Sequence, residues 1–159
     1  MAIDRRGTGL TLLRVCLGVF FLFEGLSKVR WFGNSALLTN QLSGWADTAG
    51  AASWSGRYLS AVAIPYATYF ARLVPLGEIT CGIAMIIGVW TPLFAFIAFF
   101  MALNFQFASA ALFKYSFLTS GYGLPVLGGT LALAIGGTRL PWSIHGGGSA
   151  RATKAPRSS

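Results

Sequence analysis

The sequence predicts an all-α integral membrane protein: a four-helix bundle with a helical lid between its first and second spans. Hydrophobic residues make up 55% of the 159 residues, charged residues only 10%, and the mean hydropathy is +0.65. Soluble domains carry roughly 25% charged residues, so this chain has too few charges to cover a surface in water. A soluble enzyme, a disordered regulator and a coiled coil are therefore excluded.

Four apolar stretches are each long enough to span a membrane, which takes about 20 residues. They cover residues 8–26, 66–89, 92–113 and 117–135. Only Trp90 and Thr91 separate the second stretch from the third, which predicts a tight hairpin, and Pro92 suits the first turn of a helix. Gly136 and Gly137 end the fourth stretch. We therefore predict a membrane domain over residues 1–137.

Two segments lie outside the predicted spans. Residues 31–65 are too many for a turn and too polar to span, and short helices are expected within 34–49 and 53–64. This segment is interpreted as an outer lid on the membrane surface. Residues 138–159 form a basic, Gly-rich tail, a composition that by itself favours disorder.

The basic residues are interpreted as signals of membrane topology, so no nucleic-acid partner is expected despite a net charge of +8. In the predicted layout, one side carries Arg5, Arg6, Arg139, Arg151, Lys154 and Arg157, and the other carries Lys28, Arg30, Arg57 and Lys114. Cytoplasmic loops carry the excess of Lys and Arg. Both termini are therefore predicted to be cytoplasmic, in a bacterial-type inner membrane.

Four ionisable residues fall within the first two spans: Arg14, Glu24, Arg72 and Glu78. Each costs about 2.5–3.5 kcal/mol at the centre of a bilayer, and such groups usually face the interior of the bundle. Depths counted from the helical rise predict two ion pairs, Glu24 with Arg72 and Arg14 with Glu78. Two interpretations remain open: the pairs only hold the two spans together, or they line a polar cavity.

A polar cavity would gain neutral groups from the third span, where Asn104 and Gln106 lie at middle depth. Its predicted rim consists of Lys28, Trp31, Tyr66 and Tyr69. Such a cavity suits a quinone headgroup, whose carbonyls need hydrogen-bond donors while its tail stays in lipid. A quinone or a lipid is therefore the expected ligand.

Small residues predict where helices pack closely. Gly128, Ala132 and Gly136 recur at every fourth position of the fourth span, a pattern that allows close backbone approach. Gly18 and Gly25 share one face of the first span, and Gly82 shares a face with Glu78 on the second.

No catalytic or metal-binding residue is expected. The only histidine, His145, lies in the tail, so the spans lack a histidine ligand for haem or metal. The spans also contain no nucleophile–base pair. Catalysis by this chain alone is therefore not expected.

Short motifs in the first two spans resemble those of the DoxX-like family. They are Arg14-x3-Gly18, Glu24-Gly25-x2-Lys28, and Gly77-Glu78-x3-Gly82 with Gly88. The family includes DoxD, the small membrane subunit of thiosulfate:quinone oxidoreductase. The resemblance implies a four-helix membrane subunit that works with redox partners. The long segment 31–65 and the basic tail differ from the family pattern, which argues against thiosulfate as the substrate.

Three functional hypotheses follow. The first is a non-autonomous subunit of a quinone-linked redox complex. The second is a structural accessory subunit of a larger respiratory or photosynthetic complex, which stabilises assembly and binds lipids or pigments. The third is a small transporter, although no repeat of broken helices supports it.

Overall fold

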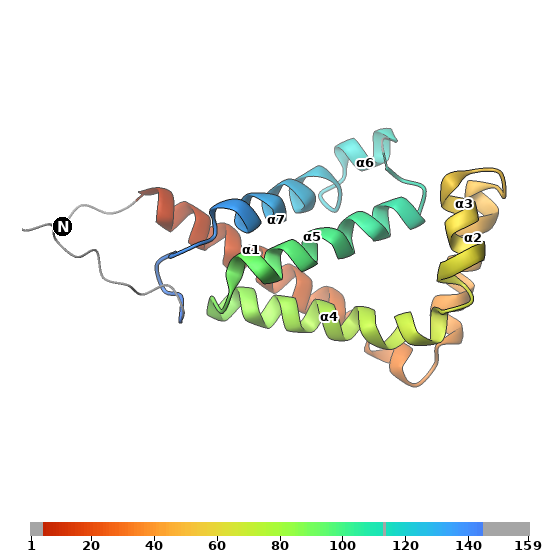
Figure 1. Ribbon diagram of the computed structural model, residues 1–159, viewed down its shortest axis with the longest axis horizontal. Coiled ribbons are helices and arrows are strands. Elements are labelled where there is room, and N and C mark those ends of the chain that lie inside the picture. The colour runs from red at the N-terminus through yellow and green to blue at the C-terminus, as the bar shows by residue number, and fades with distance from the viewer. Residues whose placement is uncertain (1–4, 113, 145–159) are drawn as a thin grey trace, which may run out of the picture.

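The computed structural model describes residues 5–112 and 114–144, and these residues form helices and no strand. Three helices are long and apolar enough to cross a membrane: α1 (Arg5–Ser27), α4 (Ala67–Ile87) and α5 (Thr91–Ala108). The predicted all-α membrane class is confirmed, and the chain is a multi-pass membrane protein. The three helices run side by side along the length of the molecule (Figure 1).

The segment between α1 and α4 is a compact helical connector at one end of the bundle (Figure 1). It comprises the 3-10 turn η1 (Val29–Phe32), α2 (Ala36–Ala49), α3 (Trp54–Tyr58) and the π-helical turn η2 (Leu59–Ala63). Gly50 ends α2 at a positive φ of 79°, and the Ser53 side chain caps α3 by accepting from the Gly56 N–H. Both segments expected to be helical are helical, while their place on the outer membrane surface stays a prediction.

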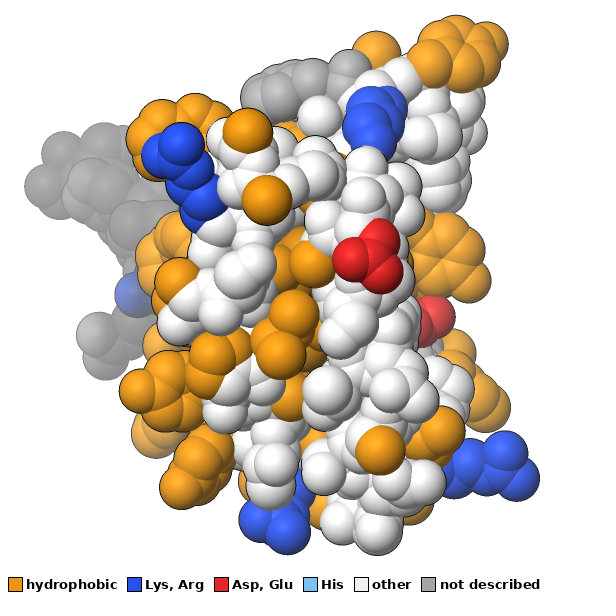
Figure 2. All heavy atoms as spheres, turned by 90° about the vertical axis from the view of Figure 1, so that its right-hand side faces the viewer, with side chains coloured by type: hydrophobic (Ala, Val, Ile, Leu, Met, Phe, Trp, Pro, Cys, Tyr) orange, Lys and Arg blue, Asp and Glu red, His pale blue; other side chains and the backbone are white. Residues whose placement is uncertain are grey.

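A hydrophobic core of its own, separate from the core inside the bundle, holds the connector against α4 and α5. Its buried members are Leu38, Leu42, Leu59, Ala63, Ala67, Ala71 and Ala108. The Ser55 hydroxyl donates a 2.8 Å hydrogen bond to the carbonyl of Ala108, at the end of α5. The connector is therefore packed in place by α4 and α5, not tethered as a loose loop. Figure 2 faces this end, where the Lys and Arg side chains stand apart from one another among hydrophobic ones.

The predicted fourth span is wrong in length. The structure divides it into α6 (Tyr115–Thr119) and α7 (Leu124–Gly136), because a turn rich in glycine at residues 120–123 interrupts it. The 13 residues of α7 extend about 20 Å at the α-helical rise, less than the roughly 30 Å hydrocarbon core. The third span is also shorter than predicted, since α5 ends at Ala108.

Three of the glycines named as packing residues lie where α1 and α4 are in close contact. A Cβ at Gly18 would lie 2.9 Å from the backbone nitrogen of Ile86, and one at Gly25 would lie 2.9 Å from that of Ile79. A Cβ at Gly82 would lie 2.8 Å from the carbonyl oxygen of Gly18. No side chain fits in these gaps, so the glycines fix the spacing of the two helices.

The predicted packing face of α7 is turned outward instead. Gly128, Ala132 and Gly136 are exposed, and a Cβ at Gly128 would meet nothing within 4 Å. The neighbouring Gly129 makes the contact, since its Cβ would lie 2.9 Å from Leu17 Cδ1. Residues on the other faces of α7, among them the fully buried Leu133, point into the core of the bundle.

The residues after α7 lie beside α1, at the end of the bundle opposite to the connector (Figure 1). The predicted tail thus begins with a segment, residues 138–144, that contacts α1. The remainder of that tail, residues 145–159, lies outside the described residues.

Candidate functional site

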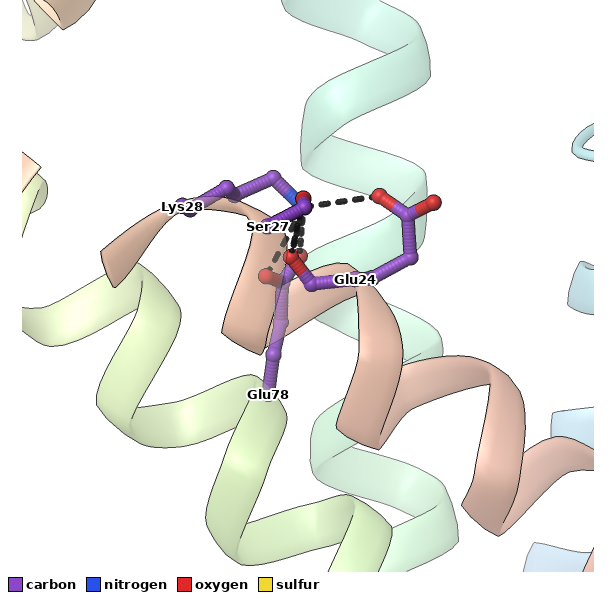
Figure 3. Close-up of polar contacts among 4 residues, drawn as sticks. All are labelled: Glu24, Ser27, Lys28 and Glu78. Carbon is purple, nitrogen blue, oxygen red and sulfur yellow. Dashed lines mark hydrogen bonds and ion pairs between the residues drawn. The ribbon is translucent and has the colours of Figure 1, made fainter. Parts of the chain in front are cut away.

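A buried lysine joins two carboxylates where α1 ends. The side chain of Lys28 is 9% exposed, and its Nζ lies 2.9 Å from Glu24 Oε2 and 2.8 Å from Glu78 Oε2. The Lys28 ammonium also donates to Glu78 Oε1 at 2.9 Å and to the carbonyl of Glu24 at 3.3 Å. Figure 3 shows Glu24 and Glu78 converging on Lys28 from two different helices. We name these three residues the Lys28 cluster.

The local sequence explains why the cluster forms. Glu24 and Lys28 are four residues apart, which places them on the same face of a helix. Glu78 comes from α4, which approaches α1 closely because Gly25 has no side chain between the two backbones. The glycine contact and the ion pair between helices therefore depend on each other.

The Lys28 cluster borders a cavity of about 180 Å³ among α1, α4, α5 and α7. Its other walls are mainly apolar: Phe20, Phe21, Met101, Ala102, Phe105, Gln106, Tyr122 and Val126. Gln106 donates a 2.8 Å hydrogen bond to the carbonyl of Tyr122 and so joins α5 to the turn before α7. Lys28 Nζ also lies 5.8 Å from the centre of the Phe105 ring, within the range of a cation–π contact. The cavity combines ionic groups with aromatic walls.

The two predicted arginine–carboxylate pairs are wrong. Arg72 is exposed and forms no ion pair within the described part of the chain. The physical reason is the helical period: Arg72 and Glu78 are six residues apart and so lie about 120° apart around α4. Only Glu78 can face α1, and its partner there is Lys28.

Arg14 is deeply buried but far from Glu78. Its guanidinium donates to the Ser143 hydroxyl and, at 3.0 Å, to the carbonyl of Trp142. Gly88 lies beside the same guanidinium, and it is ten residues, or about 15 Å along α4, from Glu78. The predicted pairing therefore placed Arg14 too close to Glu78 along the helix axes.

Of the other predicted cavity residues, Gln106 lines the cavity at Lys28, whereas Asn104 and three rim residues do not. Asn104 is exposed and accepts a 2.8 Å hydrogen bond from the Tyr58 hydroxyl of the connector. Trp31 lines a smaller cavity of about 50 Å³ between the connector, α4 and α5. Tyr66 and Tyr69 are exposed, lie next to each other and do not line the cavity at Lys28. Among the predicted rim residues, only Lys28 borders that cavity, and it lies at the centre of the charged cluster.

An apolar groove reaches the same cluster from the side. The groove has a volume of about 440 Å³ and lies between α4 and α5. Its walls include Phe70, Leu73, Phe96, Ile97 and Phe100, and it shares Glu78, Met101 and Phe105 with the cavity. A molecule with a polar head and an apolar tail could place the head at Lys28 and the tail in this groove.

The first two spans and the hairpin carry a recognisable family pattern. Residues 9–111 match the DoxX family, so the match includes α1, the connector, α4 and α5 and stops before α6. No curated protein and no solved structure matches the chain.

Proposed function

Because the chain belongs to the DoxX family, whose membrane proteins are associated with redox-related membrane subunits, we propose that it is a non-autonomous subunit of a quinone-linked redox complex. In this proposal the chain has no redox centre of its own, and a partner subunit supplies the electrons. The chain supplies the place where a quinone headgroup leaves the lipid and binds.

The observation that carries the proposal is the Lys28 cluster on the wall of an aromatic cavity. A quinone carbonyl accepts hydrogen bonds, and the Lys28 ammonium is the strongest donor facing the cavity. Glu24 is 31% exposed, so it can release Lys28 to a ligand while Glu78 keeps its contact. Reduction of a quinone consumes protons as well as electrons, and the same cluster can pass protons to the headgroup.

The groove between α4 and α5 accounts for the rest of such a ligand. It is almost wholly apolar and meets the cavity at Glu78, Met101 and Phe105. An isoprenoid tail in the groove would remain in contact with lipid while the ring lies at Lys28. This arrangement binds an amphiphile that arrives from the membrane rather than from water.

The proposal includes a placement in the membrane. We place both termini on the cytoplasmic side of a bacterial-type inner membrane, with α7 as a fourth, short span and the connector as a lid on the outer side. The supporting observation is that exposed Arg5, Arg6 and Arg139 lie at the end opposite to the connector. The Lys28 cluster then faces the outer half of the membrane.

A second candidate function is a structural accessory subunit without a ligand. The observation that favours it is the saturation of Lys28: its ammonium already donates to both carboxylates and to the carbonyl of Glu24. In that case the cluster only holds α1 against α4. The two functions differ in whether the cavity must stay open.

Filling the cavity without touching its charges separates these functions. Ala102 lines the cavity, whereas Ala132 is exposed on α7, so Ala102→Leu and Ala132→Leu are matched substitutions. Membranes that contain the full chain are photolabelled with an azido-quinone, and the labelled peptides are identified by mass spectrometry. We expect labelling of α1, α4 and α5 that Ala102→Leu abolishes and Ala132→Leu preserves. Equal labelling of both variants would contradict the quinone site and favour the structural function.

Partner identification tests the remaining part of the proposal. The chain is purified in mild detergent from its own membranes, and copurifying proteins are identified by mass spectrometry. We expect a partner that carries a flavin, haem or iron–sulfur centre. Purification of the chain without such a partner would contradict its assignment to a redox complex.

A further inference from the structure

A second buried cation lies at the end of the bundle opposite to the connector. Arg14 is 1% exposed, and its donors reach only neutral oxygens, the hydroxyl of Ser143 and the carbonyl of Trp142. Its Nε is buried and has no hydrogen-bond partner. The positive charge of Arg14 is therefore buried, and its Nε–H has no acceptor.

No carboxylate neutralises Arg14 within residues 5–112 and 114–144, because the ion pairs there both belong to Lys28. A buried charge without a counterion is strongly unfavourable. Neutral acceptors compensate only part of this cost. Among the described residues, the site therefore lacks a negative group for Arg14.

A pocket of about 270 Å³ lies against this site. Ser143 and Gly88 line the pocket and also contact the guanidinium of Arg14, so Arg14 lies directly beneath the pocket floor. Thr91, the first residue of the 18-residue helix α5, and the exposed Arg139 form other parts of the wall. The N-terminus of a long helix carries a partial positive charge. In α5 this charge is the contribution to the pocket, because Pro92 has no N–H and the N–H groups of Leu93 and Phe94 already donate to the Trp90 carbonyl. Arg14, Arg139 and the N-terminus of α5 therefore all favour a negative ligand in this pocket.

The position of the pocket indicates where the ligand comes from. The pocket lies at the turn between the membrane-spanning helices α4 and α5, and Trp90 in that turn is 59% exposed. Trp142, whose carbonyl binds Arg14, is 83% exposed. Exposed tryptophans at the ends of spanning helices lie at the level of the lipid headgroups. The pocket is thus at the depth where lipid phosphates are found.

We propose that this pocket is a binding site for the phosphate group of an anionic phospholipid. Arg139 contacts the phosphate from the open side, and Thr91, at the start of α5, and Ser143 form part of the wall around it. Arg14 supplies the buried positive charge beneath it. The site is independent of the Lys28 cluster and of the quinone proposal, because Arg14 and Lys28 are fourteen residues, or about 20 Å along the helix axis, apart.

The test is lipid binding to the purified full chain in detergent, followed by native mass spectrometry. The probes are dioleoylphosphatidylglycerol and dioleoylphosphatidylcholine, which share acyl chains and differ in net charge. Arg139→Gln removes the pocket arginine, and Arg6→Gln removes an exposed arginine at the same end of the molecule that does not line the pocket. Neither side chain is buried, and circular dichroism checks that both variants fold as the natural chain does.

We expect the first phosphatidylglycerol to bind at least about fivefold more tightly than phosphatidylcholine, as one basic contact to an anionic lipid is worth about 1 kcal/mol. Arg139→Gln should abolish this preference, and Arg6→Gln should retain it. Equal losses in the two variants would show attraction by general surface charge and overturn the proposal, as would the absence of any preference. Displacement of the lipid by an equal concentration of inorganic phosphate would also overturn it, since the ligand would then be free phosphate.

Discussion

Helix α1 and the residue that follows it carry two buried cations that are stabilised in opposite ways. Lys28 lies between two carboxylates, so the cluster holds one positive and two negative groups. Arg14, fourteen positions earlier, donates only to a hydroxyl and a carbonyl. The first site has an excess of negative charge and the second an excess of positive charge. Burial alone therefore does not identify what a cation does: its partners decide whether its charge is compensated within the described residues.

Removal of the Lys28 charge should produce the largest effect. Lys28→Met leaves Glu24 and Glu78 close together without a cation, and loss of one partner from a buried pair costs about 3–5 kcal/mol. We expect the free energy of unfolding to fall by this amount, measured by denaturation in mixed dodecyl-maltoside and dodecyl-sulfate micelles. Lys114→Met, at an exposed lysine, is the control and should change stability by less than about 0.5 kcal/mol.

A double substitution sharpens this result. With Glu78→Gln added to Lys28→Met, fewer uncompensated charges remain, so part of the stability should return. The double-mutant cycle should give a coupling energy of about 0.5–3 kcal/mol, the range seen for contacting residues. Additive effects would show that Lys28 and Glu78 do not interact energetically.

The glycine contact offers a way to weaken the Lys28 cluster without changing its charges. A Cβ at Gly25 would lie 2.9 Å from the Ile79 nitrogen and 2.9 Å from the Pro75 carbonyl, both of them backbone atoms that cannot rotate away. Gly25→Ala should therefore separate α1 from α4 and cost about 1–3 kcal/mol, the range for overpacking. In the Lys28→Met background the extra cost should be smaller, since the ion pair is already lost. Equal costs in both backgrounds would contradict the dependence of the pair on this contact.

Arg14 should be less sensitive than Lys28, although it is more deeply buried. Arg14→Met leaves a hydroxyl and a carbonyl without their donor, a loss of about 1–3 kcal/mol, and it also removes a buried charge that has no carboxylate partner among the described residues. The second effect offsets the first, so the net cost should be below about 3 kcal/mol. The same denaturation assay in micelles free of anionic phospholipid measures this value. A cost equal to that of Lys28→Met would indicate that Arg14 has a carboxylate partner after all.

The sequence was sufficient to predict the class of the protein, because low charge and long apolar stretches require a membrane. It also marked Gly18, Gly25 and Gly82 as packing positions, but it did not indicate that α1 and α4 meet at them. The sequence did not predict the partners of the charged groups. Matching residues by their depth along the helix axis ignores the side of the helix on which each residue lies. Lys28 was assigned to the rim although the i, i+4 spacing from Glu24 was visible. Arg14 has its partners in residues 142–143, a contact between distant segments that no local pattern indicates.

The smallest expected effect concerns the outer face of α7. Gly128 lies on the predicted packing face, yet it is exposed, and a Cβ there would meet nothing within 4 Å. Gly128→Ala should therefore leave stability unchanged or raise it by up to about 1 kcal/mol, because alanine favours the helix. Gly129→Ala, one residue on, should be less favourable than Gly128→Ala, since its Cβ would lie 2.9 Å from Leu17 Cδ1 and this side chain would have to rotate. The pair is compared in the purified chain and again in native membranes. A loss of stability for Gly128→Ala only in the membranes would show that a partner helix covers this face there, and a loss in the purified chain would contradict the orientation of α7.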